Sequence, residues 1–84
     1  MRRKINLNGS SQESLIEDYR KTLDALNEAL ENFSKVMPHG RDYQINEHPQ
    51  EDYEEDRKEH LVNVAKMHDV RQYIHNCIVS IGTQ

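Results

Sequence analysis

Residues 16–37 read IEDYRKTLDALNEALENFSKVM, and this stretch decides the fold. Apolar side chains recur along it at alternating intervals of three and four residues, over three heptads. Such a pattern is typical of a helix that packs lengthwise against another helix. The stretch therefore predicts a long amphipathic helix in an all-α protein. The apolar positions are Ile16, Tyr19, Leu23, Leu26, Leu30, Phe33 and Met37.

Flanking residues set the limits of this predicted helix. Ser10 and Glu13 have the spacing of a capping box, in which each side chain bonds the backbone of the other residue. Pro38 and Gly40 follow the last apolar position and end the helix. The predicted helix spans residues 10–37, after an arm, residues 1–9, that is flexible or docked on a neighbour. Residues 38–48 are the predicted connection, because they are rich in turn formers.

A second helix is predicted over residues 49–81. Pro49 suits its first position, and the acidic residues that follow suit the positive end of the helix dipole. The apolar stripe begins only about three turns later, so we expect residues 15–37 to pack against residues 61–81. The first turns, including the acidic block 51–59, should then protrude. The predicted stripe is Leu61, Val64, Met67, Val70, Ile74, Cys77 or Ile78, and Ile81.

Composition indicates how such a hairpin is stabilised. With 84 residues, 35% of them hydrophobic and 31% charged, the chain is one domain with little material for a core of its own. Cys77 is the single cysteine, which excludes a disulfide within the chain and a zinc site built from several thiolates. Oligomerisation remains among the usual aids to small folds. We therefore predict an antiparallel two-helix hairpin that assembles into a homo-oligomeric helical bundle.

Charge and hydropathy exclude several classes of partner. The net charge of −4 argues against a protein that coats a nucleic acid polymer. No apolar run approaches the roughly 20 residues of a membrane span. The basic start, residues 2–4, is not followed by the apolar run of a secretion signal. Together with one free thiol, these features predict a cytoplasmic protein without a membrane partner.

No arrangement of residues predicts an enzyme, a metal site or a cofactor. Asp56 and His60 are four residues apart on the predicted helix, which supplies only a two-ligand pair. His75 and Cys77 are two residues apart, so their side chains point about 200° away from each other. They cannot form a nucleophile–base pair within one chain. Catalytic, metal and cofactor residues are therefore all predicted to be absent.

A compact anionic ligand is a more specific hypothesis. Arginine offers a two-pronged donor for phosphate, and a tyrosine ring can stack on a base. Copies of the hairpin could hold such a ligand where they meet. The alternative, that these residues are ordinary surface charges and interface aromatics, remains open. The candidate ligand-binding residues are Arg41, Tyr43, Lys66, Arg71, Tyr73 and Asn76.

One segment resembles a known family. Residues 19–44 read YRKTLDALNEALENFSKVMPHGRDYQ, a long amphipathic helix that closes on an apolar-Pro-x-Gly-Arg-acidic turn. This pattern resembles the hairpin domain of phage anti-CBASS and anti-Thoeris proteins, which sequester nucleotide immune signals. Residues 75–79, HNCIV, are loosely similar to the end of that family's second helix. The resemblance covers about half of the chain and carries over Arg41 and Asn76.

The resemblance implies a phage protein that acts in the host cytoplasm without catalysis. It would bind a cyclic or ADP-ribose-derived nucleotide at subunit junctions, as an anti-defence sponge. The residues alone support a second hypothesis, a coiled-coil interaction module that inhibits or tethers a host or phage protein. Its basis is the heptad pattern together with the acidic block 51–59, which is complementary to a basic surface.

Overall fold

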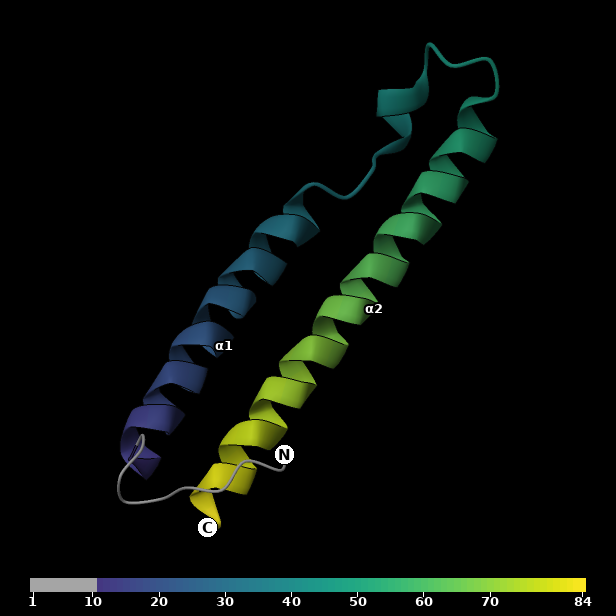
Figure 1. The fold of residues 1–84 in the computed structure, drawn as a ribbon. Helices are drawn as coiled ribbons and strands as arrows, with labels where there is room; N and C mark the ends of the chain where they lie inside the picture. The colour runs from purple at the N-terminus through teal and green to yellow at the C-terminus, as the bar shows by residue number, and fades with distance from the viewer. Residues whose placement is uncertain (1–10) are drawn as a thin grey trace.

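The computed structural model describes residues 11–84 as a helical hairpin. Its elements are α1 (Gln12–Lys35), a short 3-10 helix η1 (Gly40–Tyr43) and α2 (Pro49–Gly82), without any strand in the described range. α1 and α2 lie side by side and antiparallel, and η1 lies in the connection between them (Figure 1). The predicted all-α hairpin is confirmed. The predicted arm, residues 1–9, lies outside the described residues.

The ends of α1 lie inside the predicted limits of 10–37. Its N-cap is Ser11, whose hydroxyl accepts a hydrogen bond from the Ser14 N–H at 3.0 Å. The expected cap, Ser10, lies outside the described residues. At the other end, the Val36 N–H bonds the Phe33 carbonyl at 3.3 Å and closes the helix. Met37 falls in the connection, because the ring of the following proline disfavours helical backbone at that position.

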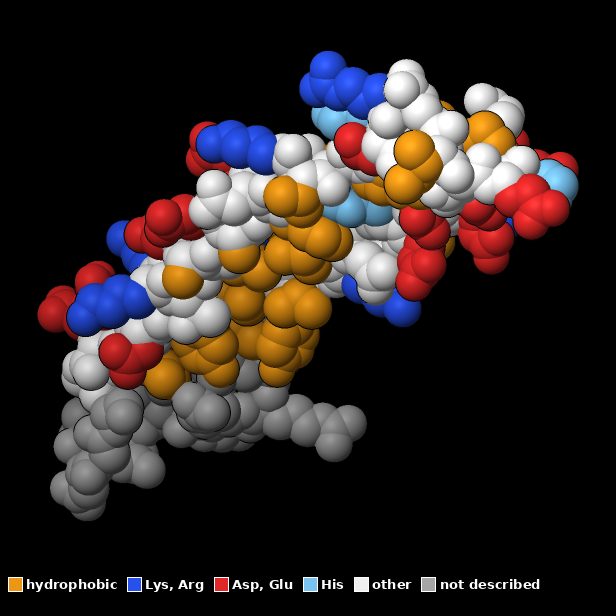
Figure 2. Space-filling model, turned by 90° about the horizontal axis from the view of Figure 1, so that it is seen from above, with side chains coloured by type: hydrophobic (Ala, Val, Ile, Leu, Met, Phe, Trp, Pro, Cys, Tyr) orange, Lys and Arg blue, Asp and Glu red, His pale blue; other side chains and the backbone are white. Residues whose placement is uncertain are grey.

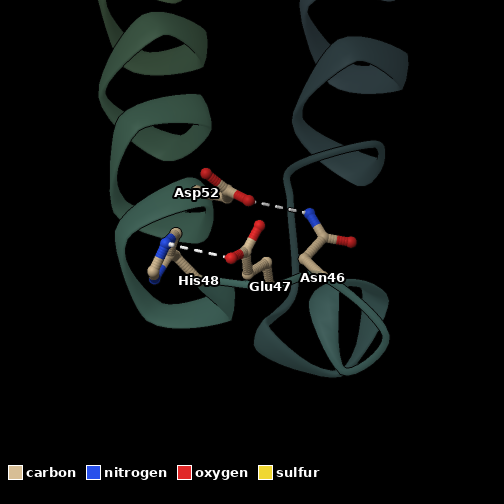
Figure 3. Close-up of polar contacts among 4 residues, drawn as sticks. All are labelled: Asn46, Glu47, His48 and Asp52. Atoms are coloured by element: carbon tan, nitrogen blue, oxygen red, sulfur yellow. Dashed lines mark hydrogen bonds and ion pairs between the residues drawn. The ribbon is translucent and has the colours of Figure 1, made fainter.

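α2 begins at Pro49, as predicted, and ends at Gly82, one residue beyond the prediction. Its first turn is tied to the connection (Figure 3). The Asn46 amide donates to the Asp52 carboxylate at 3.0 Å, and the His48 Nε2 lies 4.0 Å from a carboxylate oxygen of Glu47. Asp52 therefore both complements the helix dipole and holds the chain as it enters α2.

The contact between the two long helices follows the heptad of α1. All seven predicted apolar positions, six in α1 and Met37 just after it, are half-buried, as expected for side chains turned toward α2. In α2, however, the prediction is wrong at two positions, because Leu61 and Val70 are exposed. The facing positions next to Val64 and Met67 are instead occupied by polar residues. His60 lies four residues before Val64, and Arg71 lies four residues after Met67. We call this line of facing residues the seam.

Both polar seam residues make a specific contact with α1. The His60 ring lies on the Phe33 ring, with centroids 4.3 Å apart. The Arg71 Nε donates to the Asn27 side-chain oxygen at 2.6 Å. These contacts explain why polar residues can occupy seam positions. His60 packs its ring on a ring of the opposite helix, and Arg71 donates a hydrogen bond to that helix.

The best-buried part of the hairpin lies where the end of α2 meets the start of α1. Leu15, Ile74, Cys77 and Ile81 are the buried apolar side chains of the described residues. The Gln12 amide donates to the Ile81 carbonyl at 2.8 Å and fixes the two helix ends together. Elsewhere along the seam the side chains remain half-exposed, because two helices cannot surround a side chain.

The opposite end of α2 extends past α1. With about 1.5 Å per residue, 34 residues make α2 about 51 Å long, against about 36 Å for the 24 residues of α1. The molecule measures 63 × 19 × 16 Å. The predicted protrusion of the first turns needs correction, because the connection and η1 run beside them (Figure 1). Neither described helix has an apolar run that could cross a membrane.

Truncation at the buried end should destabilise the hairpin. Ile81 has no exposed surface, whereas Ile45 in the connection is 97% exposed. We expect Ile81→Ala to lower the free energy of unfolding by about 2–5 kcal/mol, from lost burial and a residual cavity. Ile45→Ala should change it by less than about 0.5 kcal/mol. Urea denaturation followed by circular dichroism measures both, and equal effects would contradict the described core.

Candidate functional site

The six candidate ligand-binding residues do not meet within one copy. Arg41 and Tyr43 belong to η1, whereas Arg71, Tyr73 and Asn76 lie in the second half of α2. The Tyr43 side chain reaches α2 at Asp56. Fifteen helical residues separate Asp56 from Arg71, which corresponds to about 22 Å. A single ligand that touches both groups would need a second copy of the chain.

The η1 end is strongly acidic. The Tyr43 hydroxyl donates to the Asp56 carboxylate at 2.8 Å, and its ring lies edge-on to Tyr53 with centroids 5.9 Å apart. This hydrogen bond, with the nearby charges of Asp56, Asp42 and Asp52, raises the pKa of Tyr43 to about 12. The same negative potential works against a phosphate group beside this ring.

The other candidates have mixed surroundings. Lys66 lines a shallow hollow of about 670 Å³ that also includes the carboxylates of Glu55 and Glu59. The Asn76 side-chain oxygen accepts from the Gln72 amide at 2.9 Å. Tyr73 is exposed on the outer side of α2. Of the six, Arg71 has the best-defined position, because its bond to Asn27 crosses the seam.

One flank of the seam is polar. On α1 it carries Arg20, Asn27 and Ser34, which recur every seven residues and so share one side of the helix. On α2 it carries Gln72 and His75, which line a hollow of about 200 Å³ together with Leu23 and Arg71. The Arg71–Asn27 hydrogen bond joins the two halves of this flank. We call it the polar face.

The opposite flank of the seam is apolar. Its α1 side carries Thr22, Ala29 and Val36 at seven-residue intervals, each directly before a heptad position. Its α2 side carries Val70 and the buried Cys77, again seven residues apart. Val36 is 68% exposed and Val70 is 51% exposed. We call this flank the apolar face.

A space-filling view of one side of the hairpin shows how its side chains are distributed (Figure 2). Hydrophobic side chains form a band along its length, and Lys, Arg, Asp and Glu side chains stand mainly at the margins of the band. A further shallow groove, of about 760 Å³, lies on α2 alone between Tyr53 and Ala65, with Glu54, Arg57 and Lys58 among its lining residues. Its mixed charges favour no single class of ligand.

Asp56 and His60, the two-ligand pair considered for a metal, each contact another residue. Asp56 accepts the Tyr43 hydrogen bond, and His60 lies on Phe33. Within residues 11–84 no group of three or more His, Cys, Asp or Glu side chains is arranged to hold an ion. The thiol of Cys77 is buried.

Sequence reasoning missed Asn27, Gln72 and His75 as parts of a shared surface. The available signal was the residue next to each heptad position, which is polar on one side of α1 and small or apolar on the other. That signal distinguishes the two flanks of one helix. It does not reveal which residues of α2 share each flank, because this depends on the register between the helices.

Comparison of the chain with protein-family models, curated proteins and solved structures finds no match. The resemblance to nucleotide-sequestering phage proteins therefore remains a prediction that rests on residues 19–44 and 75–79.

The Tyr43–Asp56 contact predicts an unusual tyrosine titration. In an unfolded chain Tyr43 should ionise near its ordinary value of 10.0, whereas in the fold its pKa is about 12. Because the folded value is higher, the contact stabilises the fold below pH 10, and this contribution disappears as the pH rises through about 12. Ultraviolet titration should therefore show one late-ionising tyrosine.

Asp56→Asn should lower that late pKa by removing both the carboxylate acceptor and its charge. Tyr43→Phe is the matched control, since it should delete the late phase and leave the other tyrosines unchanged. A late phase that persists in Tyr43→Phe would assign it to another tyrosine and contradict the described contact.

Proposed function

We propose that this chain is a non-catalytic helical interaction module that pairs with a second copy of itself through the apolar face. The observation that carries the proposal is the incomplete burial of the seam. Six heptad side chains of α1, and Met37 just after it, are only half-buried in the single hairpin. Two paired hairpins make a four-helix bundle, which is the common way in which such side chains are enclosed.

The chemistry of the two flanks indicates which of them contacts the second copy. The apolar face carries Ala29, Val36 and Val70, all exposed in the single hairpin. Small residues such as Ala29 let a neighbouring helix approach closely, and larger ones such as Val36 fill the space beside it. The polar face would bury an arginine, two amides and a histidine instead, at a substantial cost in desolvation.

The available area is sufficient for a stable pair. A standard interface buries about 800 Å² on each partner. The single hairpin exposes 6780 Å², so this would engage roughly an eighth of its surface. The elongated shape, 63 Å by 19 Å, offers this area along one side. The acidic block at the start of α2 then stays outside the bundle, where it can meet a basic partner protein.

A second candidate function is sequestration of a cyclic or ADP-ribose-derived nucleotide, as the family resemblance implies. The observation in its favour is Arg71, whose guanidinium is held at the polar face by Asn27. In this proposal Arg41 and Tyr43 of one copy meet Arg71, Tyr73 and Asn76 of another, because the two groups lie far apart in a single chain. Sequestration therefore also depends on self-association.

Self-association is tested by introducing a charged side chain on the apolar face. We expect sedimentation equilibrium to show a dimer or larger even-numbered assembly, and Val70→Glu to weaken it by tenfold or more. Val79→Glu is the matched control: Val79 is equally 51% exposed on α2, but nine residues from Val70 it points to the opposite side of the helix. A monomeric wild-type chain would end this proposal, as would equal effects of the two variants.

Sequestration is tested by calorimetric titration with cyclic dinucleotides, cyclic trinucleotides and ADP-ribose. We expect one of them to bind with a dissociation constant of about 1 μM or lower, corresponding to about −8 kcal/mol. Arg41→Ala and Asn76→Ala should weaken that binding, and Arg57→Ala on the outer groove should not. Absence of heat and of thermal stabilisation with every nucleotide, at concentrations far above micromolar, would reject sequestration and leave self-association standing.

A further inference from the structure

The polar face contains a hollow whose lining differs from that of three other hollows formed by residues 11–84. Leu23, Arg71, Gln72 and His75 line it, without any carboxylate. The two grooves on α2 include Glu54 in one case and Glu55 with Glu59 in the other. A further hollow on α1 includes Asp18. An anion near Arg71 therefore meets a cationic group without an acidic neighbour in the lining.

Arg71 is held in a position suited to anion binding. Its Nε donates to Asn27 of the opposite helix at 2.6 Å, which places the guanidinium beside the groove between the helices. This bond uses one of the five N–H donors and leaves the two terminal nitrogens, which form a planar fork. Among residues 11–84 no carboxylate forms an ion pair with this arginine. The fork matches two oxygens of a phosphate or carboxylate group.

Two further donors come from the same helix. His75 lies one turn after Arg71, so both side chains project from the same side of α2. A neutral imidazole still carries one N–H donor. The Gln72 amide donates to Asn76 at 2.9 Å, which orients its nitrogen and leaves a second N–H on it. The hollow thus combines the Arg71 cation with two further N–H donors.

The size of the hollow limits the ligand. Its volume of about 200 Å³ is below the roughly 300 Å³ at which pockets for drug-sized ligands begin. It suits one tetrahedral oxyanion group and not a whole nucleotide. We infer that Arg71, Gln72 and His75, with Asn27 as a positioning residue, form a binding site for a single phosphate group. The phosphate is either free or carried by a larger molecule that extends out of the hollow.

This inference deepens the sequestration proposal by naming the group that binds and where it binds, but the site itself needs only one copy of the chain. The test is a ¹H–¹⁵N NMR titration of the full chain with sodium phosphate, with sodium chloride at equal ionic strength as reference. We expect saturable shifts at Asn27, Arg71, Gln72 and His75. Shifts that grow without saturation, or that are as large at Arg57 and Lys66, would overturn the site.

Variants distinguish specific binding of phosphate at this site from non-specific attraction to positive side chains. Arg71→Gln should abolish the saturable shifts, and Arg71→Lys should weaken binding several-fold, because lysine keeps the charge but loses the fork and the bond to Asn27. Asn27→Ala keeps the arginine but removes its positioning bond, so it should also weaken binding, and it provides a second test if the Arg71 variants do not fold. Arg57→Gln is the matched control and should bind phosphate as the wild type does. Unchanged binding in Arg71→Gln would reject the site.

A parallel titration with a cyclic dinucleotide distinguishes the two sources of phosphate. Saturable binding of both ligands at the hollow supports the site and its use in sequestration. Phosphate binding without nucleotide binding supports the site and rejects sequestration by it. Nucleotide binding that is unaffected by Arg71→Gln rejects the use of this hollow in sequestration, while leaving the sequestration proposal itself intact.

Discussion

The contact between two antiparallel helices is the constraint on which the rest of this structure depends. A pair of helices buries only the side chains directly between them and leaves both flanks of the contact open to solvent. The heptad residues of α1 are accordingly half-buried, and the buried apolar side chains of residues 11–84 are four that lie where the chain ends of the hairpin meet. The character of the two open flanks therefore decides what such a small protein can do.

The two flanks differ most clearly on α1, whereas on α2 the flank of Val70 also carries Asn63 and the flank of His75 also carries Leu61. Small and apolar residues follow the heptad on one side, at Thr22, Ala29 and Val36. Polar residues follow it on the other, and there Asn27 receives the Arg71 side chain. A surface that is apolar on one flank suits association with another helical pair, while the polar flank stays accessible to small anions. The proposed pairing through the apolar face and the proposed phosphate site on the polar face therefore lie on different sides of the hairpin.

Polar residues within the seam give the hairpin its register. His60 on Phe33 and Arg71 on Asn27 occur at defined levels, and the Gln12–Ile81 bond fixes the ends. An apolar stripe alone permits helices to slide by a heptad, because each apolar contact is much like the next. A slide here would leave the Arg71 hydrogen bond unmade. We interpret these polar contacts as the feature that selects one alignment.

Sequence alone determined the all-α hairpin, the heptad face of α1 and the start of α2 at Pro49, because periodicity and proline act locally. It did not determine the seam of α2, where Leu61 and Val70 face outward and His60 and Arg71 face α1. Hydrophobicity alone favours Leu61 over His60 and Val70 over Arg71 as the residue that faces α1. Which residue of each pair does so depends on the three-and-four spacing along the whole of α2. The candidate site shows the same division: sequence singled out Arg71, and only the tertiary register placed it beside Asn27 and far from Arg41.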